Sequence, residues 1–300
     1  MTLTELRYLV ALARERHFGR AAEVCHVSQP TLSAAIRKLE DHLGLTLFER
    51  RPREVRVVPE AEPIIAQAQR VLEQVDAMEQ MAHHHRDQLS APLRVGAIFT
   101  VAPYLLPVII PEIRRTAPDM PLFIEENYTH VLRGKLDRGE LDAIIVALPF
   151  SGGGLVRASM YDESFSVLLP ADHPWTEQEE IRPEQLLDET LLLLGEGHCF
   201  RDQVLELCPA ITSERQKNLV QIEGGSLETL RHMVASGLGI TVLPDSALHG
   251  NGYEAGTFAI RPFVPPTPSR TIALVWRDSF PRPRAIEVVR QAVPREGLAH

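Results

Sequence analysis

Cysteine is scarce in this sequence, with three in 300 residues, and no two of them have the C-x-x-C spacing of thiol oxidoreductases. Long hydrophobic runs are absent as well, since nothing approaches the ~18 to 20 apolar residues that a membrane span needs. Residues 1–7 also lack the basic and then apolar pattern of a secretory signal. We therefore expect a cytoplasmic protein with no membrane contact, in a compartment where permanent structural disulfides are rare.

An overall excess of positive charge is also lacking, because 31 Lys/Arg stand against 40 Asp/Glu, for a net charge of −9. The distribution is uneven, however. Residues 1–58 carry ten Lys/Arg against seven Asp/Glu, and the remainder carries 21 against 33. The first segment suits a phosphate backbone and the rest does not, which indicates two functions in one chain. A length of 300 residues with 44% hydrophobic and 24% charged residues is typical of about two globular domains.

Two of the three cysteines, Cys199 and Cys208, lie in one segment of good helix formers. Phe200, Val204 and Leu207 fall on one face of the predicted helix. At ~1.5 Å rise per residue the two cysteines would be roughly 13 Å apart, whereas a disulfide tolerates a Cα separation of about 6.8 Å at most. The thiols therefore cannot bond while the helix exists, and bonding would refold the segment. The plain alternative, two unrelated buried thiols, stays open at this point.

Cys199 has the surroundings of a reactive thiol. Glycines in residues 195–197 predict a turn that puts it at the start of the helix, where free N–H groups and the helix dipole favour a thiolate, and His198 precedes it. We predict Cys199 as the nucleophile toward an oxidant and Cys208 as the partner that captures the resulting sulfenic acid. Cys25, the third cysteine, is interpreted as a core thiol.

Residues 1–58 predict a winged helix-turn-helix. Ser28 is a suitable N-cap for its third helix, and Pro30 is tolerated in the first turn. Small polar residues at the start of that helix can approach base edges, and basic residues further along can meet phosphates. Residues 45–50 and 55–58 predict a hairpin with a basic tip, the wing. A small helical subdomain with a solvated charged face is the alternative. The predicted DNA-binding residues are Ser28, Gln29, Pro30, Thr31, Ser33, Arg37, Lys38, Arg50 and Arg53.

A long amphipathic helix is predicted over residues 64–81. Its apolar residues recur at three-and-four spacing, which suits pairing with a second copy of the chain. His83, His84 and His85 follow, but consecutive helical residues point about 100° apart, so they cannot converge on one ion. We therefore predict no metal site there, and no cofactor.

From residue 93 onward strands and helices alternate, which predicts two α/β lobes built on a parallel sheet. In such folds ligands lie at the carboxyl ends of strands and at helix N-termini, and Thr100 and Thr129 stand at such places. The plain interpretation of both threonines is as N-caps. Strands are expected at residues 93–97, 121–125, 142–147, 165–169, 191–194, 219–222, 239–243 and 271–276. Helices are expected at residues 105–115, 131–138, 230–236 and 284–293.

Residues 21–33, 36–40 and 47–50 resemble the DNA-binding domain of the LysR-type transcriptional regulators over a long and specific match. The segments 195–208 and 270–277 further resemble the hydrogen-peroxide sensors of that family. One departure lies at residues 57–63, where the family's Thr-Pro-x-Gly type junction is replaced by a proline-rich and acidic sequence that could re-angle the next helix.

The resemblance implies a two-lobed effector domain with the periplasmic-binding-protein fold, in a homodimer or homotetramer. It also implies binding to double-stranded DNA whether reduced or oxidised, recruitment of RNA polymerase after oxidation, and resetting by thiol reductants such as glutaredoxin or thioredoxin. By the same resemblance Thr100, Thr129, His198 and Arg270 surround a peroxidatic cysteine at Cys199. Their hydroxyls suit holding hydrogen peroxide, and His198 or Arg270 suits stabilising the thiolate and the departing hydroxide.

Three hypotheses follow. The first is a redox-sensing transcription factor, which is oxidised at Cys199 and locked by a bond to Cys208. The second is a LysR-type regulator that binds a small molecule between its lobes and has inert cysteines. The third, a thiol peroxidase, leaves residues 1–81 without a purpose, so we predict that the chain is not an enzyme. The predicted domains are residues 1–58 for DNA binding, 59–89 for the linker and dimerisation helix, and 90–300 for the regulatory domain.

Overall fold

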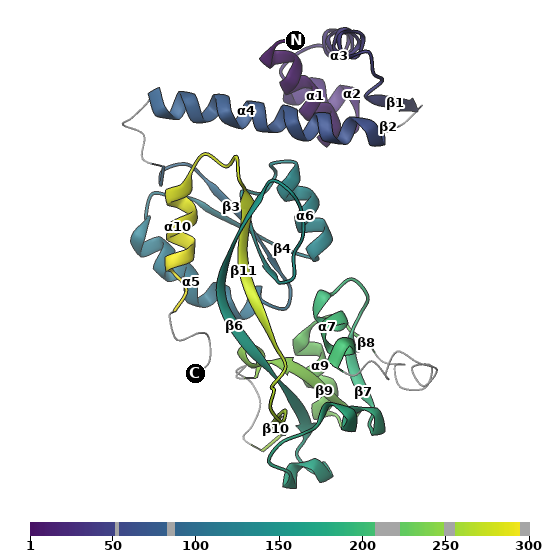
Figure 1. The fold of residues 1–300 in the computed structure, drawn as a ribbon, viewed down its shortest axis with the longest axis vertical. Coiled ribbons are helices and arrows are strands. Elements are labelled where there is room, and N and C mark those ends of the chain that lie inside the picture. The colour runs from purple at the N-terminus through teal and green to yellow at the C-terminus, as the bar shows by residue number, and fades with distance from the viewer. Residues whose placement is uncertain (52–53, 83–87, 208–222, 249–255, 295–300) are drawn as a thin grey trace.

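The computed structural model describes residues 1–51, 54–82, 88–207, 223–248 and 256–294. Figure 1 shows a small helical unit at the N-terminus, one long helix lying across beneath it, and two lobes stacked below that helix. The fold class is therefore confirmed as a winged helix-turn-helix, a long helix and a two-lobed α/β domain. Within the described ranges no helix is long and apolar enough to cross a membrane.

The N-terminal unit packs three helices and a two-stranded wing around one core. Leu9, Leu12, Leu32 and Ile36 are fully buried in that core, because apolar residues recur at helical spacing on α1 and α3. Ser28 is the N-cap of α3, since its Oγ accepts a hydrogen bond from the backbone N–H of Thr31 at 3.3 Å. The elements are α1 Leu3–Glu15, α2 Phe18–Val24, α3 Gln29–Leu43, β1 Phe48–Arg51 and β2 Glu54–Val57.

The unusual junction after the wing forms a regular helix start. A 3₁₀ turn, Pro59–Ala61, leads directly into the long helix α4, Glu62–Ala82. Pro63 lies in the first turn of α4, where its missing N–H has no intrahelical acceptor to lose. The long helix is thus confirmed, and it packs on α1 along the side away from the lobes.

In the two-lobed domain, nine strands of the described chain form one sheet in the order β4-β3-β5-β11-β6-β9-β7-β8, with β10 beside β6. The sheet is mixed rather than parallel, because β11 runs antiparallel to both β5 and β6. The two long strands β6, Leu155–Pro170, and β11, Ser269–Arg277, pass through both lobes and join them (Figure 1). The first lobe contains β3 Leu93–Ile98, β4 Leu122–Asn127 and β5 Ala143–Ala147, and the second contains β7 Leu191–Leu194, β8 Glu223–Gly224, β9 Ile240–Pro244 and β10 Phe258–Pro262.

Each lobe has its own apolar core beneath its helices. The expected strand at residues 219–222 lies outside the described residues. Three strand segments were not predicted, namely β8, β10 and the first ten residues of β6. The helices of the first lobe are α5 Ala102–Thr116, α6 Thr129–Asp137 and α10 Pro283–Gln291, and those of the second are α7 Cys199–Leu207 and α9 Leu227–Ala235.

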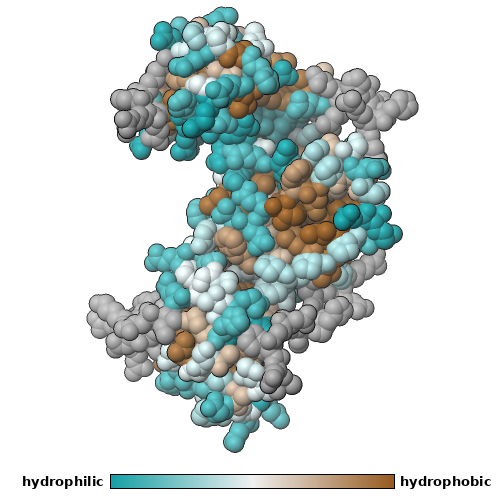
Figure 2. All heavy atoms as spheres, turned by 180° about the vertical axis from the view of Figure 1, so that it is seen from behind, coloured by the Kyte–Doolittle hydropathy of each residue, from teal (hydrophilic) through white to brown (hydrophobic). Residues whose placement is uncertain are grey.

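Surface hydropathy differs between the parts of the molecule. In Figure 2, hydrophilic atoms dominate over the N-terminal unit, whereas apolar atoms gather on the rear face of the first lobe. Two exposed apolar side chains of that lobe are Val108 on α5, 40% exposed, and Phe123 on the edge strand β4, 56% exposed.

Candidate functional site

Cys199 is the first residue of α7, as the glycine-rich turn predicted. Gly197 has a φ of 95°, in the left-handed region that favours glycine, and a side chain there would press against the ring of Tyr128. The backbone N–H of Arg201 bonds to the carbonyl of His198 at 3.0 Å, which closes the first turn. Cys199 is half-buried and is a free thiol. Its place at the helix N-terminus favours an anion there.

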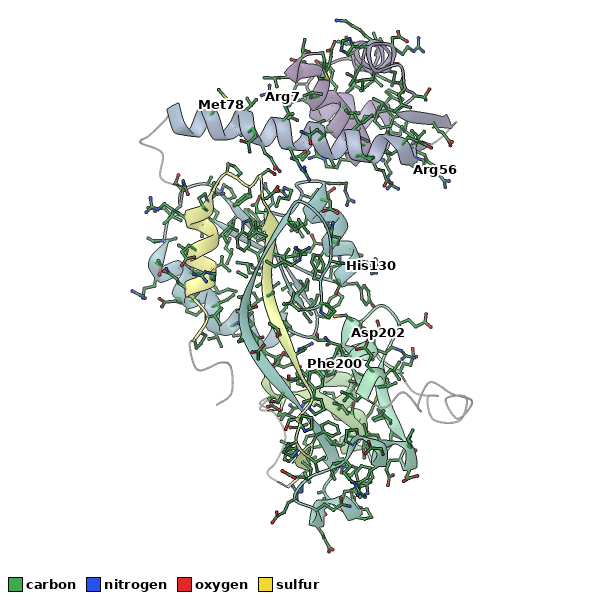
Figure 3. The ribbon with its side chains drawn as sticks, viewed as in Figure 1. Arg7, Arg56, Met78, His130, Phe200 and Asp202 are labelled. Atoms are coloured by element: carbon green, nitrogen blue, oxygen red, sulfur yellow. The ribbon has the colours of Figure 1, made fainter. Side chains whose placement is uncertain are left out.

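The thiol lines a small cavity between the two lobes, with room for about one water-sized molecule. Two walls come from the carboxyl ends of the parallel strands β3 and β4, the place where open α/β sheets bind ligands. In Figure 3, His130 on α6 and Phe200 and Asp202 on α7 mark the two sides of this region. The lining residues are Ile98, Phe99, Thr100, Asn127, Tyr128, Thr129, Gly197, His198 and Cys199.

Both predicted threonines line this cavity, but the N-cap interpretation was wrong. The N-cap of α5 is Val101 and that of α6 is Tyr128, neither with a side-chain capping bond, so Thr129 is already helical. The Thr129 Oγ1 is buried and has no hydrogen-bond partner within the described part of the chain. An unpaired buried hydroxyl is costly, and it is the donor and acceptor that a small polar ligand would use.

Arg270 approaches the site through Thr100. Its guanidinium donates to the Thr100 Oγ1 at 2.9 Å and to the Thr100 carbonyl at 3.0 Å. On its other side it pairs with the buried carboxylate of Glu163 at 2.7 Å and lies 4.9 Å from the centre of the Phe200 ring. Glu163 also accepts a hydrogen bond from Ser246 at 2.5 Å. Arg270 is therefore a positioning residue, with its charge balanced by Glu163.

His198 is enclosed by aromatic rings. The centre of its imidazole lies 4.8 Å from that of Tyr128 and 5.8 Å from that of Phe99. Burial lowers the pKa of His198 below its ordinary value, so the ring is neutral at pH 7. A neutral imidazole donates or accepts one hydrogen bond in the cavity, whereas it supplies no positive charge to a thiolate.

Cys208 lies outside the described residues, but α7 restricts how Cys199 could bond to it. The helix runs to Leu207, whose Cα lies about 12 Å from that of Cys199 at 1.5 Å per residue. Adjacent Cα atoms are about 3.8 Å apart, and a disulfide needs a Cα separation of about 6.8 Å or less. A bond between Cys199 and the residue after Leu207 therefore requires part of α7 to unwind.

Cys25 differs from Cys199 in its surroundings. It caps the end of α2 and is half-buried against the core of the N-terminal unit. Burial raises the pKa of the Cys25 thiol, with the charge of Arg14 opposing that effect. A raised pKa leaves less thiolate at neutral pH, which agrees with a core thiol.

The predicted DNA-binding residues lie together at the start and along the outer face of α3. Ser28, Gln29, Pro30, Thr31, Arg37 and Lys38 are exposed, and Ser33 is half-buried. Lys38 forms an ion pair with Glu5 at 3.2 Å, which lowers the pKa of that carboxyl, so Lys38 is partly engaged within the protein. Arg53 and the side chain of Arg50 lie outside the described residues. The role of these residues stays a prediction.

Three further site residues were not predicted from the sequence. Phe99 and Tyr128 enclose His198, and Glu163 holds Arg270. A signal for Glu163 existed in the alternation of β6, where Tyr161, Glu163 and Phe165 all face inward. A carboxylate on a buried strand face demands a cation. No group of three metal-ligating side chains occurs in the described ranges, and the residues 83–85 lie outside them.

The winged helix-turn-helix and the two-lobed domain with a site between its lobes define a DNA-binding regulator that responds to a small signal. Residues 3–62 match the family model "Bacterial regulatory helix-turn-helix protein, lysR family", and residues 86–297 match "LysR substrate binding domain". The chain therefore belongs to the LysR family of bacterial regulatory proteins.

Individual relatives cover nearly the whole chain. The DNA-binding transcriptional dual regulator OxyR of Escherichia coli is 41% identical over 98% of this chain and 95% of its own. Full-length OxyR C199D from Pseudomonas aeruginosa is 57% identical, with a TM-score of 0.86 over 97% of this chain and 94% of its own. A hydrogen-peroxide-bound OxyR mutant of Corynebacterium glutamicum is 34% identical, with a TM-score of 0.63 over 97% and 92%.

Proposed function

We propose that this chain is an OxyR-type sensor of hydrogen peroxide that regulates the transcription of oxidative-stress genes. One observation carries the proposal: Cys199 stands at the N-terminus of α7 in a cavity for about one water-sized molecule, beside the Thr129 hydroxyl, which has no partner among the described residues. A cavity of that size suits a peroxide better than a metabolite. The relatives named OxyR, one of them bound to hydrogen peroxide, support the assignment.

The proposed reaction starts with attack of the Cys199 thiolate on one oxygen of hydrogen peroxide. The O–O bond breaks, the sulfur becomes a sulfenic acid, and the departing hydroxide takes a proton and leaves as water. The hydroxyls of Thr100 and Thr129 would orient the peroxide, and the neutral imidazole of His198 would exchange a hydrogen bond with the departing oxygen. Arg270 acts indirectly, by fixing Thr100.

The sulfenic acid is then captured by Cys208. The Cys208 thiolate attacks the sulfenic sulfur, a disulfide forms, and the hydroxyl leaves as a second water after protonation. Because α7 keeps its two ends far apart, this step requires the helix to unwind. Unwinding exposes part of the core beneath it, where Phe200 and Val204 are buried. A thiol reductant such as glutaredoxin or thioredoxin would reverse the bond and let α7 reform.

The output is proposed to be a change in how a dimer or tetramer holds its DNA. The exposed residues at the start of α3 would enter the major groove, and two copies would present two such helices. The regulator would recruit RNA polymerase from its DNA site, in the cytoplasm, and it would use the disulfide as a signal rather than as a step of enzymatic turnover. No cofactor enters this proposal.

The test is to treat reduced full-length protein with one equivalent of hydrogen peroxide and to map its disulfides by mass spectrometry. We expect a Cys199–Cys208 bond that is lost in Cys199→Ser, a stable sulfenic acid in Cys208→Ser, and unchanged behaviour in the matched control Cys25→Ser. Thiols that stay reduced in the wild type would overturn the proposal. So would a disulfide that forms while far-UV circular dichroism and amide exchange at α7 stay unchanged.

A further inference from the structure

A second and larger cavity lies between α4 and the first lobe, remote from Cys199. Its volume is about 520 Å³, within the range of small-molecule sites. Its walls come from the end of α1, from the first half of α4, and from α6 with the end of β11. Six arginines line it: Arg14, Arg16, Arg70, Arg133, Arg138 and Arg277.

Arginines outnumber carboxylates among the described residues that line this cavity, and four of the six have carboxylate partners: Arg14 with Glu15, Arg133 with Asp137, Arg138 with Glu140 and Arg277 with Glu73. Only two carboxylates, those of Glu62 and Asp137, are among its lining residues. Asp137 is already paired with Arg133 at 2.7 Å. Arg16, the C-cap residue of α1, and Arg70 on α4 have no carboxylate partner within the described residues, so two guanidinium groups are available to a ligand.

The loop between β5 and β6 makes room for two of these guanidinium groups. Gly154 has a φ of 69°, and a Cβ there would collide with the Nη2 of Arg70. Gly152 has a φ of 147°, and a Cβ there would collide with the Nη1 of Arg133. Both positions thus combine a backbone conformation that favours glycine with a close approach of an arginine. Of the six arginines, Arg277 is buried and Arg133 is half-buried, whereas Arg14, Arg16, Arg70 and Arg138 are exposed.

The remaining surface of the cavity is apolar. Val10 and Ala13 of α1, Ile65 of α4 and Leu155 at the start of β6 lie among the arginines. Guanidinium groups bind phosphate oxygens in a bidentate fashion, and apolar side chains suit an organic body. We propose that this cavity binds a small organic phosphate that carries at least two negative charges, with Arg16 and Arg70 as the main contacts.

Such a ligand would act on the DNA-binding unit. Arg16 belongs to that unit, Arg70 to the linker helix, and Arg133 to the regulatory domain, so one bound ligand would contact all three parts of the chain. A ligand that contacts these parts in only one arrangement shifts the protein toward that arrangement. This site would let a metabolite signal adjust DNA binding independently of the thiol at Cys199.

The test is isothermal titration calorimetry on the reduced full-length protein with three probes. The buffer contains about 0.15 M salt, the physiological ionic strength. ATP carries both the phosphates and an organic body, pyrophosphate carries only the charge, and adenosine carries only the body. We expect saturable binding of ATP, weaker binding of pyrophosphate, and none of adenosine. Arg70→Gln and Arg16→Gln should each weaken ATP binding about tenfold or more, since each removes a charge-assisted hydrogen bond.

The matched control is Arg290→Gln, which removes an equal charge from the exposed face of α10 and should leave ATP binding unchanged. Cys199→Ser should also bind ATP normally, which separates this site from the peroxide reaction. Absence of saturable ATP binding would overturn the proposal, as would an equal loss in Arg290→Gln. Sedimentation velocity provides a further check: a change of oligomeric state in Arg70→Gln without loss of ATP binding would show that the cavity faces a second copy of the chain instead.

Discussion

Arg277 and Glu73 form a buried ion pair, with 2.6 Å between the Arg277 Nε and the Glu73 Oε1 and side chains that are 9% and 8% exposed. Arg277 ends β11 and Glu73 lies on α4, so the pair ties the linker helix to the regulatory domain. Arg277 also donates to the Leu141 carbonyl at 2.7 Å, and Ser279 donates to Glu73. The same strand carries Arg270 of the peroxide site, about 23 Å away at 3.3 Å per residue.

Removing one partner of this pair should destabilise the protein strongly. Glu73→Ala leaves the Arg277 guanidinium buried without its counter-charge, and we expect a loss of about 3–5 kcal/mol in the free energy of unfolding. Urea unfolding followed by circular dichroism measures it. Glu287→Ala is the matched control, because Glu287 pairs with Arg290 on an exposed helix face and should lose little. A loss in Glu73→Ala no larger than in this control would contradict the expectation.

Thr129 allows stability and reactivity to be separated. Thr129→Val removes a buried hydroxyl that has no partner in the described chain, so the free energy of unfolding should rise by about 1 kcal/mol. If the hydroxyl holds the peroxide, the rate of Cys199 oxidation should fall about tenfold, because the transition state loses one hydrogen bond. Stopped-flow measurement of thiol loss against peroxide concentration gives this rate.

The control for Thr129 is another buried threonine whose hydroxyl is satisfied. Thr241 donates to the Leu192 carbonyl at 2.9 Å, away from the site. Thr241→Val should lower stability by about 1 kcal/mol and leave the oxidation rate unchanged. An unchanged oxidation rate in Thr129→Val would mean that this hydroxyl plays no part in the reaction.

The parts of the fold and site that follow local rules could be predicted from the sequence. Ser28 with Pro30 gave the start of α3, and the glycine-rich turn before Cys199 gave the start of α7. Both signals act within a few residues of the element that they define. The same kind of signal misled at Thr129, because α6 begins one residue early, with Tyr128 as the cap.

The parts that depend on distant contacts could not be predicted. Glu163 and Arg270 are 107 residues apart, and no local pattern pairs them. The first ten residues of β6 mix apolar, polar and charged side chains without a regular alternation, and they form a strand because β11 pairs with them along their length. The large arginine-lined cavity likewise exists only because the fold brings α1, α4 and α6 together.

Glu163 should control the peroxide site through Arg270. Glu163→Gln removes the charge that holds the guanidinium, so Arg270 and with it Thr100 should shift, and we expect the oxidation rate of Cys199 to fall by about 10². The measurement is again the rate of thiol loss on adding peroxide. Asp162→Asn is the control, because Asp162 is the exposed neighbour on β6 and accepts a hydrogen bond from Thr271. Equal rates in both variants would exclude this role.

His198 should make the stability of the regulatory domain depend on pH. Burial lowers its pKa in the folded protein, whereas the unfolded chain takes up the proton near its ordinary pKa of about 6.5. The unfolded state therefore binds more protons below that pH. The free energy of unfolding is therefore undiminished by His198 above about pH 6.5. It decreases as the pH falls toward the folded-state pKa, by up to about 1.4 kcal/mol per pH unit.

Urea unfolding at several pH values between about 5 and 8 measures this dependence. His198→Gln removes the titrating group, so its free energy of unfolding should decline less steeply than that of the wild type as the pH falls. His42→Gln changes an exposed histidine on α3 and should keep the wild-type slope. Identical slopes in the wild type and in His198→Gln would show that the imidazole is not held neutral by burial, and His198 would then be able to act as a cation beside Cys199.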